Sequence, residues 1–420
     1  MSSPPNVAVA PGWRARIADP MFAAVCALGI TQITGWGTSY YCLGVLAGPI
    51  ADDTGWSRSL IYFGFTVALL AMGFVSTWVG RAIDHYGARG VMSLGTLLVS
   101  AGLYLLAHVS GQEAYLAAWV FLGLGMRLCL YDAAMAALVQ VVPSRGRRAS
   151  SYLTLFGAFA SSVFWVVGHY LNEAVGWRAT LELFAVINLA VCLPLHWIGL
   201  ARRERAHPHA QDSSASVGQT GHDGPPLEAG KRRIAIALFA LIMSLNAYVF
   251  GIVTVQLVPL LEAAGLATAA AVWVASMKGF AQFGGRLVEI VFGRNLRAIS
   301  IARIAIGVLP LSFVTLLLSG GNLAAIVLFT VLMGASQGVI TIVRGAVPLA
   351  LFGATGYGAV LGVLATPVLL VTAASPTLFA LIVDAAGWQA AEWSLIACAA
   401  ASWVAMELMS RWYERGRVRH

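Results

Sequence analysis

Apolar runs long enough to cross a membrane recur along the whole chain. A helix that spans a bilayer needs about 20 mostly apolar residues, and twelve stretches of the 420-residue sequence meet that length. Only 10% of the residues are charged, against about 25% in soluble globular proteins. We therefore predict an all-α membrane protein with twelve transmembrane helices, at residues 21–49, 59–80, 90–109, 115–141, 149–171, 179–200, 234–261, 268–292, 298–318, 323–349, 356–383 and 389–410.

A polar segment at 201–233 divides the predicted helices into two sets of six. It is rich in Ser, His, Gly and Pro, a composition that does not form a packed core, so we expect a linker there. Two dipeptides recur at similar positions in the two halves: Gly80-Arg81 with Gly285-Arg286, and Gly176-Trp177 with Gly387-Trp388. We expect two pseudo-symmetric six-helix bundles, 21–200 and 234–410, with tails at 1–20 and 411–420.

The basic residues are distributed unevenly between the predicted loops. With the N-terminus in the cytoplasm, 19 of the 26 Lys and Arg residues lie in cytoplasmic segments and two, Arg58 and Arg178, lie on the other side. This bias predicts that both termini and the linker are cytoplasmic. The net charge of +8 then reflects helix ends near anionic headgroups and not a nucleic-acid partner. We expect a multi-pass, monomeric protein of the plasma membrane, the inner membrane in a bacterium.

Motifs for catalysis or metal binding do not occur in the sequence. The five cysteines are scattered through apolar segments, and no pair has the spacing of metal ligands. Walker, GxSxG and HExxH patterns are absent too. We therefore expect neither an enzyme nor an ATP-driven pump, and no cofactor.

The loop after the second predicted helix carries the most specific motif. It reads GRAIDHYGARG at residues 80–90, and Gly80, Asp84, Gly87 and Arg89 fit the pattern G-x-x-x-D-x-x-G-x-R. This pattern resembles the signature loop of the major facilitator superfamily, which lies at this position on the cytoplasmic side. The resemblance implies a major facilitator fold and a gating role for these four residues, which hold the two halves together when the transporter is open to the outside.

Other segments resemble one branch of that superfamily, the monocarboxylate and oxalate/formate transporters. ITGWGTSYY at 33–41 is similar to the acidic-Gly-x-x-Trp-x-Trp motif of that branch, but Thr34 stands where the acid is expected. The branch also carries an Asp four residues before an Arg in the eighth helix. Here the Arg is Arg286 and the Asp position is Gln282. Because the resemblance ties that Asp to proton coupling, both proton symport and anion exchange remain open.

Three ionisable residues, Lys278, Arg286 and Glu289, interrupt the predicted helix 268–292. Lys278, Gln282 and Arg286 recur at i, i+4 and i+8, so they lie along one stripe of the helix, and Glu289 follows three positions later. Ionisable side chains are costly in hydrocarbon and generally face a protein interior or water. We expect this stripe to line a central, water-filled site, where Arg286 and Lys278 bind a carboxylate.

Further candidates come from the helices that line the central site in the resembling fold. We assign substrate binding to Arg286, Lys278, Gln282, Arg127, Trp36, Tyr40, Asn246 and Gln337, and coupling to Glu289 and Asp132. Each has a structural alternative: Arg286 as a partner of Glu289, Arg127 as a partner of Asp132 or Glu289, the two rings as packing aromatics, and Arg344 as a residue that reaches the cytoplasmic interface.

Basic residues outnumber acidic ones among these buried candidates. Arg127, Lys278, Arg286 and Arg344 face Asp132 and Glu289, and a positive site in low dielectric attracts anions. The sequence therefore predicts a secondary transporter for a small organic anion. The alternatives are an efflux pump for a drug or a toxic anion, and a non-transporting receptor on the same fold.

Overall fold

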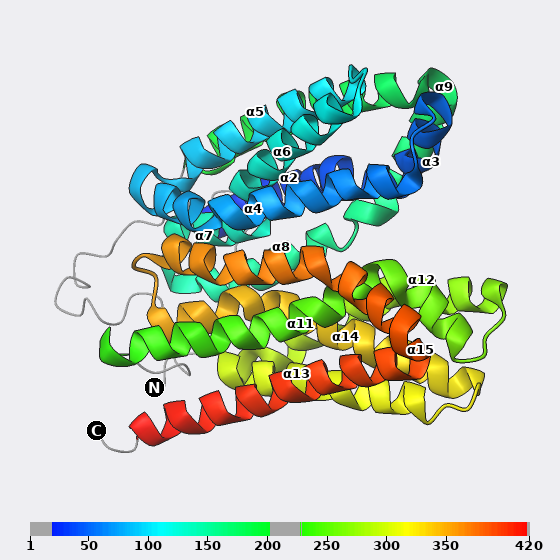
Figure 1. Cartoon of the computed structure of the whole chain (residues 1–420). Helices are drawn as coiled ribbons and strands as arrows, with labels where there is room; N and C mark the ends of the chain where they lie inside the picture. The colour runs from blue at the N-terminus through cyan, green and yellow to red at the C-terminus, as the bar shows by residue number, and fades with distance from the viewer. Residues whose placement is uncertain (1–18, 202–226, 228, 418–420) are drawn as a thin grey trace, which may run out of the picture.

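The computed structural model describes residues 19–201, 227 and 229–417, and every regular element in these residues is a helix. The predicted all-α class is therefore confirmed. Helices α2 to α10 form one half in Figure 1, and α11 to α15 form the other. The first half contains α2 (Pro20–Gly35), a π-helix (Trp36–Tyr40), α3 (Leu43–Thr54), α4 (Arg58–Tyr86), α5 (Ala88–Ala107), α6 (Gln112–Cys129), α7 (Tyr131–Val141), α8 (Gly146–Gly157), α9 (Ala160–Ile187) and α10 (Leu193–Gly199).

The second half contains fewer and longer helices: α11 (Ala229–Ala263), α12 (Thr268–Phe292), α13 (Ala298–Leu317), α14 (Leu323–Phe352) and α15 (Tyr357–Arg417). Since α11 begins at Ala229 and α15 ends at Arg417, the last residues of the predicted linker 201–233 and the first of the predicted tail 411–420 are helical. Residues 1–18, 202–226, 228 and 418–420, which make up most of the remaining parts of both tails and of the linker, lie outside the described residues.

Nine helical stretches in the described part of the chain are long and apolar enough to cross a membrane. Helix α12 is not one of them, because the polar stripe from Lys278 to Glu289 lowers its apolar content. Two long runs are interrupted: Gly176 in α9 has φ 80° and Gly387 in α15 has φ 82°. Only glycine adopts this conformation readily. The two Gly-Trp dipeptides therefore share one backbone break, which supports the internal repeat.

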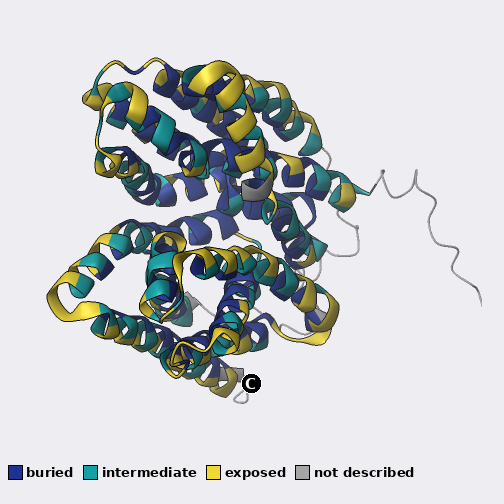
Figure 2. Ribbon diagram, turned by 90° about the vertical axis from the view of Figure 1, so that its right-hand side faces the viewer, coloured by how far each residue is buried: buried dark blue, intermediate teal, exposed yellow. Residues whose placement is uncertain are grey.

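The outer surface of the helices is apolar. Figure 2 shows exposed residues along the outward faces of both halves, and large hydrophobic side chains are among them: Trp78 is 65% exposed and Phe280 is 81% exposed. Soluble proteins rarely expose such side chains over extended areas. The multi-pass membrane character predicted from the sequence is thereby supported.

Contacts between the two halves concentrate where α4 runs along the first part of α15. Gly80 lies against the backbone of Gly358, and Gly362 lies against the carbonyl of Ser76, so closely that a Cβ on either glycine would overlap its partner. The hydroxyls of Thr77 and Thr366 are 3.4 Å apart. We call this contact the α4–α15 seam, formed by Ser76, Thr77, Gly80, Gly358, Gly362 and Thr366.

Candidate functional site

Arg286 is buried on α12 and contacts the other half of the molecule. Its side chain is 5% exposed, and its Nη1 donates to the Thr154 carbonyl of α8 at 2.6 Å. Nε donates to the carbonyl of Gly338 on α14 at 3.3 Å. Both acceptors are neutral, so the guanidinium has hydrogen bonds but no ion pair among the described residues.

The alternative in which Arg286 pairs with Glu289 is not what the structure contains. Glu289 instead lies beside Arg147 of α8, with Oε1 3.9 Å from Nη2. Arg147 also donates to the Leu296 carbonyl at 3.1 Å, just after α12. Glu289 and Arg147 therefore join α12 to α8, and the charge of Arg286 is not neutralised by its helical neighbour.

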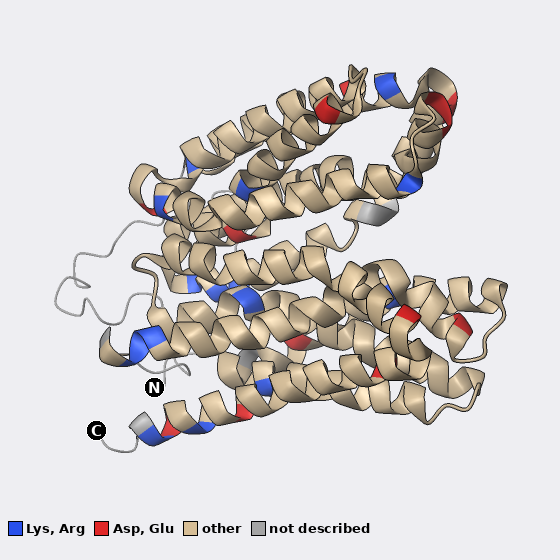
Figure 3. Ribbon diagram, in the orientation of Figure 1, with Lys and Arg blue, Asp and Glu red and all other residues tan. Residues whose placement is uncertain are grey.

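Lys278 lies two helical turns from Arg286 on the same stripe. Its Nζ is 5.6 Å from the centroid of the Phe250 ring on α11, a cation–π distance. In the described part of the chain it has no carboxylate within ion-pair distance and no hydrogen bond. Figure 3 shows how sparse charge is in the middle of the helices. Lys278 and Arg286 are thus two cations without acidic partners on one face of α12.

Arg127 and Asp132 flank a break between α6 and α7. Leu130 has φ −82° and ψ −164°, which ends α6 and lets α7 start at Tyr131. Across this break Arg127 Nη1 is 3.1 Å from Asp132 Oδ2, and Nε donates to Ser76 Oγ at 2.5 Å. Discontinuous helices of this kind often accompany ion and substrate sites in transporters.

Asp132 has a second basic partner, Arg344, which belongs to the other half of the chain. Its Nη2 is 2.7 Å from the same Asp132 oxygen that Arg127 contacts. One carboxylate therefore bridges an arginine of α6 and an arginine of α14. Arg344 is an ion-pair partner here, although its side chain keeps 31% exposure.

Trp36 and Tyr40 gather with two further rings. The Trp36 ring centroid lies 4.7 Å from that of Tyr40, 5.1 Å from that of Tyr131 and 6.0 Å from that of Tyr41. Trp36 to Tyr40 form the π-helix between α2 and α3, a local irregularity that is frequent at functional sites. Sequence reasoning missed Tyr41 and Tyr131, and no spacing rule identifies them.

The remaining candidates for substrate binding lie at two different places in the structure. Gln282 Nε2 is 3.5 Å from Gln337 Oε1, which links α12 to α14 next to the charged stripe. Asn246 instead donates to Ser402 Oγ at 2.5 Å. That bond ties α11 to the second part of α15, and the structure gives Asn246 no contact with Arg286 or Lys278.

The signature loop joins the two halves through Asp84. Its carboxylate accepts the backbone N–H groups of Gly358 at 2.9 Å and Ala359 at 2.6 Å. These groups belong to the first turn of α15, where N–H groups lack helical partners and negative charge is favoured. Gly87 has φ 84° and makes the turn from α4 to α5. Arg89 stacks on Trp197 of its own half at 3.9 Å and does not reach the other half.

We expect Asp84→Asn to weaken this contact by about 1 kcal/mol, because an amide has one oxygen where the carboxylate has two and carries no charge. Spin labels on α4 and α15 near the seam should then report a larger population of separated distances. Asp52→Asn is the matched control, since Asp52 is exposed at the end of α3. Identical distance distributions in wild type and Asp84→Asn would contradict the gating role.

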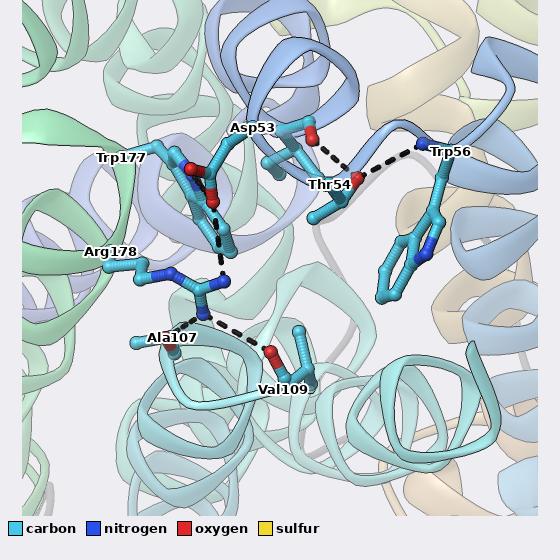
Figure 4. Close-up of polar contacts among 8 residues, drawn as sticks. Asp53, Thr54, Trp56, Ala107, Val109, Trp177 and Arg178 are labelled. Atoms are coloured by element: carbon cyan, nitrogen blue, oxygen red, sulfur yellow. Dashed lines mark hydrogen bonds and ion pairs between the residues drawn. The ribbon is translucent and has the colours of Figure 1, made fainter. Parts of the chain in front are cut away.

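A second polar group fixes the opposite end of the first half. Arg178 donates to the carbonyls of Ala107 at 2.8 Å and Val109 at 3.2 Å, and it lies 3.3 Å from the Asp53 carboxylate. Trp177 Nε1 also donates to Asp53 at 3.2 Å. Figure 4 shows Arg178 reaching from its helix toward Asp53 and toward the carbonyls of Ala107 and Val109. The contacts join the C-terminal ends of α3 and α5 to the break in α9, and they are structural.

Comparison with known proteins identifies the family. The model of the Major Facilitator Superfamily matches residues 21–321. The chain belongs to the major facilitator superfamily. Members of this family are transporters and not enzymes, and the resemblance predicted from the sequence is confirmed.

Related sequences point toward the predicted branch. The chain is 26% identical to the MFS-type transporter YcxA of Bacillus subtilis (strain 168) over 222 residues, 51% of each chain. It is 31% identical to mouse monocarboxylate transporter 6 over 114 residues, 26% of this chain and 24% of that protein. Rat monocarboxylate transporter 3 is 31% identical over 144 residues, 34% of this chain and 27% of that protein. The matched regions thus span about half or less of these relatives.

Solved structures share the fold over nearly the whole chain. The human organic anion transporter MFSD10 aligns with a TM-score of 0.66 at 16% identity, over 94% of this chain and 100% of that one. The Escherichia coli fucose:proton symporter FucP aligns with a TM-score of 0.66 at 15% identity, over 94% and 99%. At this identity the likeness establishes the major facilitator fold alone.

Proposed function

We propose that the protein is a secondary transporter that moves a small organic anion across the membrane by alternating access. The observation that carries this proposal is the pair of cations on α12. Lys278 and Arg286 share one face of the helix, and neither has a carboxylate partner in the described part of the chain. A buried charge without a partner is unfavourable, so an anionic ligand that neutralises it binds strongly.

The relatives support the same substrate class. The monocarboxylate transporters named above carry monocarboxylates, as their names state. In this proposal Arg286 and Lys278 hold the carboxylate, with Gln282, Gln337, Trp36 and Tyr40 around it. Arg127 supports the site through Asp132 and does not bind the substrate itself, because its charge is already paired.

The proposal includes twelve spans in two six-helix bundles, 21–200 and 234–410. The nine apolar stretches support it together with α12 and the breaks at Gly176 and Gly387, which divide two stretches into four. We further propose that the protein acts as a monomer. Its molecular mass in detergent, measured by light scattering, tests that statement.

In this proposal, transport is coupled either to protons, by symport, or to the exchange of another anion. Proton symport requires Glu289, Asp132 or the substrate carboxylate itself as the proton carrier, since the Asp of the resembling branch is Gln282 here, whereas anion exchange requires none of them. Uptake of labelled carboxylates into proteoliposomes, with and without a pH gradient and with and without an internal anion, tests both routes and the substrate class together. Absence of uptake or exchange for every carboxylate would refute the proposed function.

We propose that both termini lie in the cytoplasm of a bacterial cell, from the bias in basic residues. In a cysteine-free background, Ala215→Cys in the 201–233 segment should resist an impermeant thiol reagent in intact cells. Ser110→Cys, exposed between α5 and α6, should react. The reverse pattern of labelling would overturn the orientation.

A further inference from the structure

Four aromatic rings form a continuous group beside Arg286. We call this group the aromatic wall: Trp36, Tyr40, Tyr41 and Tyr131. Phe65 extends it, with its ring centroid 4.7 Å from that of Tyr40. The wall meets Arg286 at Thr154, whose carbonyl accepts from the Tyr131 hydroxyl at 3.4 Å and from Arg286 Nη1 at 2.6 Å.

The polar atoms at the centre of the wall are already occupied. Trp36 Nε1 donates to Gln32 Oε1 at 3.1 Å, and Gln32 in turn donates to the Cys129 carbonyl at 2.9 Å. The Tyr131 hydroxyl is engaged with Thr154 as described. The Trp36 indole and the Tyr131 phenol therefore present ring surface, not free hydrogen-bonding groups, to a ligand that lies against them.

Neighbouring side chains of the protein do not cover the aromatic wall completely. Other rings of the same half, such as Trp119 and Tyr115, are 0% exposed. All four rings of the wall remain partly exposed. On the neighbouring guanidinium, Nε and Nη1 donate to backbone carbonyls, and the Tyr131 hydroxyl interacts with the same group. The structure thus combines partly exposed ring surface with a guanidinium that has no acidic partner in the described part of the chain.

We propose that the substrate is a monocarboxylate that carries an aromatic ring, with its carboxylate on Arg286 and its ring against Trp36. This inference rests on the proposed function and narrows it. Offset or edge-to-face ring contacts add to the burial of apolar area, so an aromatic carboxylate should bind on the order of tenfold or more tighter than a short aliphatic one.

The test uses the full-length protein in detergent with phenylacetate, cyclohexylacetate and propionate, measured by calorimetry. We expect phenylacetate to bind most tightly and propionate at least about tenfold more weakly, with cyclohexylacetate between them. Trp36→Leu should weaken the binding of phenylacetate by a larger factor than that of propionate and so remove most of the preference for phenylacetate. Trp36→Phe should restore part of it. Trp78→Leu, which alters a ring that is 65% exposed on the outer face of α4, should change neither ligand.

The outcomes separate the two proposals. Equal affinity for phenylacetate and propionate in the wild type would overturn the aromatic substrate while leaving anion transport intact. An equal loss for all three ligands in Trp36→Leu would show a structural role for the ring and also overturn it. If none of the three carboxylates binds and none is transported, both the inference and the proposed function fail. The wild-type comparison needs no variant and so does not depend on the folding of any mutant.

Discussion

Arg286→Gln is expected to weaken carboxylate binding about 100-fold or more, which corresponds to losing one partner of a buried charge pair. Arg286→Lys should lose about tenfold although it keeps the charge, because a lysine lacks the planar fork that matches a carboxylate. Calorimetric affinity and ligand-induced thermal shift, measured with the carboxylate that is transported best, report both effects.

The contacts of Arg286 determine which variants serve as controls for this prediction. Glu289 lies beside Arg147 and not beside Arg286, so adding Glu289→Gln to Arg286→Gln should not restore affinity. Arg303→Gln is the matched control, since Arg303 pairs with Glu407 on α15 at 2.7 Å and is 38% exposed. Full affinity in Arg286→Gln would contradict the binding role and leave Lys278 as the anion's partner.

Asp132→Asn is expected to cost about 3–5 kcal/mol of stability, the effect of breaking a buried ion pair by removing one partner. The change leaves the Arg127 guanidinium, 3% exposed, without its carboxylate and also releases Arg344 from the opposite half. Arg344→Gln should cost less, because Asp132 then keeps Arg127. Thermal unfolding in detergent measures the difference.

Asp53→Asn provides the comparison for an exposed pair. Asp53 lies 3.3 Å from Arg178 with 52% of its side chain exposed, and such pairs contribute at most about 1 kcal/mol. Equal losses for Asp53→Asn and Asp132→Asn would mean that the Arg127–Asp132–Arg344 group is not the buried anchor described above. A larger loss in Asp132→Asn supports it.

Helices and their bounds were the most predictable feature of this protein. The predicted helix 268–292 has the same bounds as α12 in the structure, because a membrane span must satisfy its backbone internally over a fixed thickness. The Gly-Trp dipeptides also indicated real breaks, since φ near +80° requires glycine. The break at Leu130 and the π-helix from Trp36 to Tyr40 have no comparable signal, because no residue type is required there.

Partners across the bundle could not be predicted. The signature loop indicated that Asp84 helps to hold the two halves together, but not that its partner is the first turn of α15, 274 positions further along the chain. A pair of Arg127 with Asp132 was one structural alternative, and the second bond of Asp132, to Arg344, depends on how α7 and α14 come together. Arg147 was not a candidate, although it contacts the α12–α13 turn. Pairing between distant helices follows from packing and has no local pattern.

The α4–α15 seam has a thermodynamic consequence. Ser76, Thr77 and Gly80 meet Gly358, Gly362 and Thr366 without any large side chain inserted between the helices. Separating these six residues therefore requires no rotamer change among them, although the buried Leu361 and Leu369 beside them pack in the same clusters as α4 residues. The Asp84 bonds to the first turn of α15 are lost in the same separation. The seam itself can therefore part and close again without repacking these side chains. A ligand that binds one arrangement more tightly than the other then shifts their relative populations by the ratio of its two affinities.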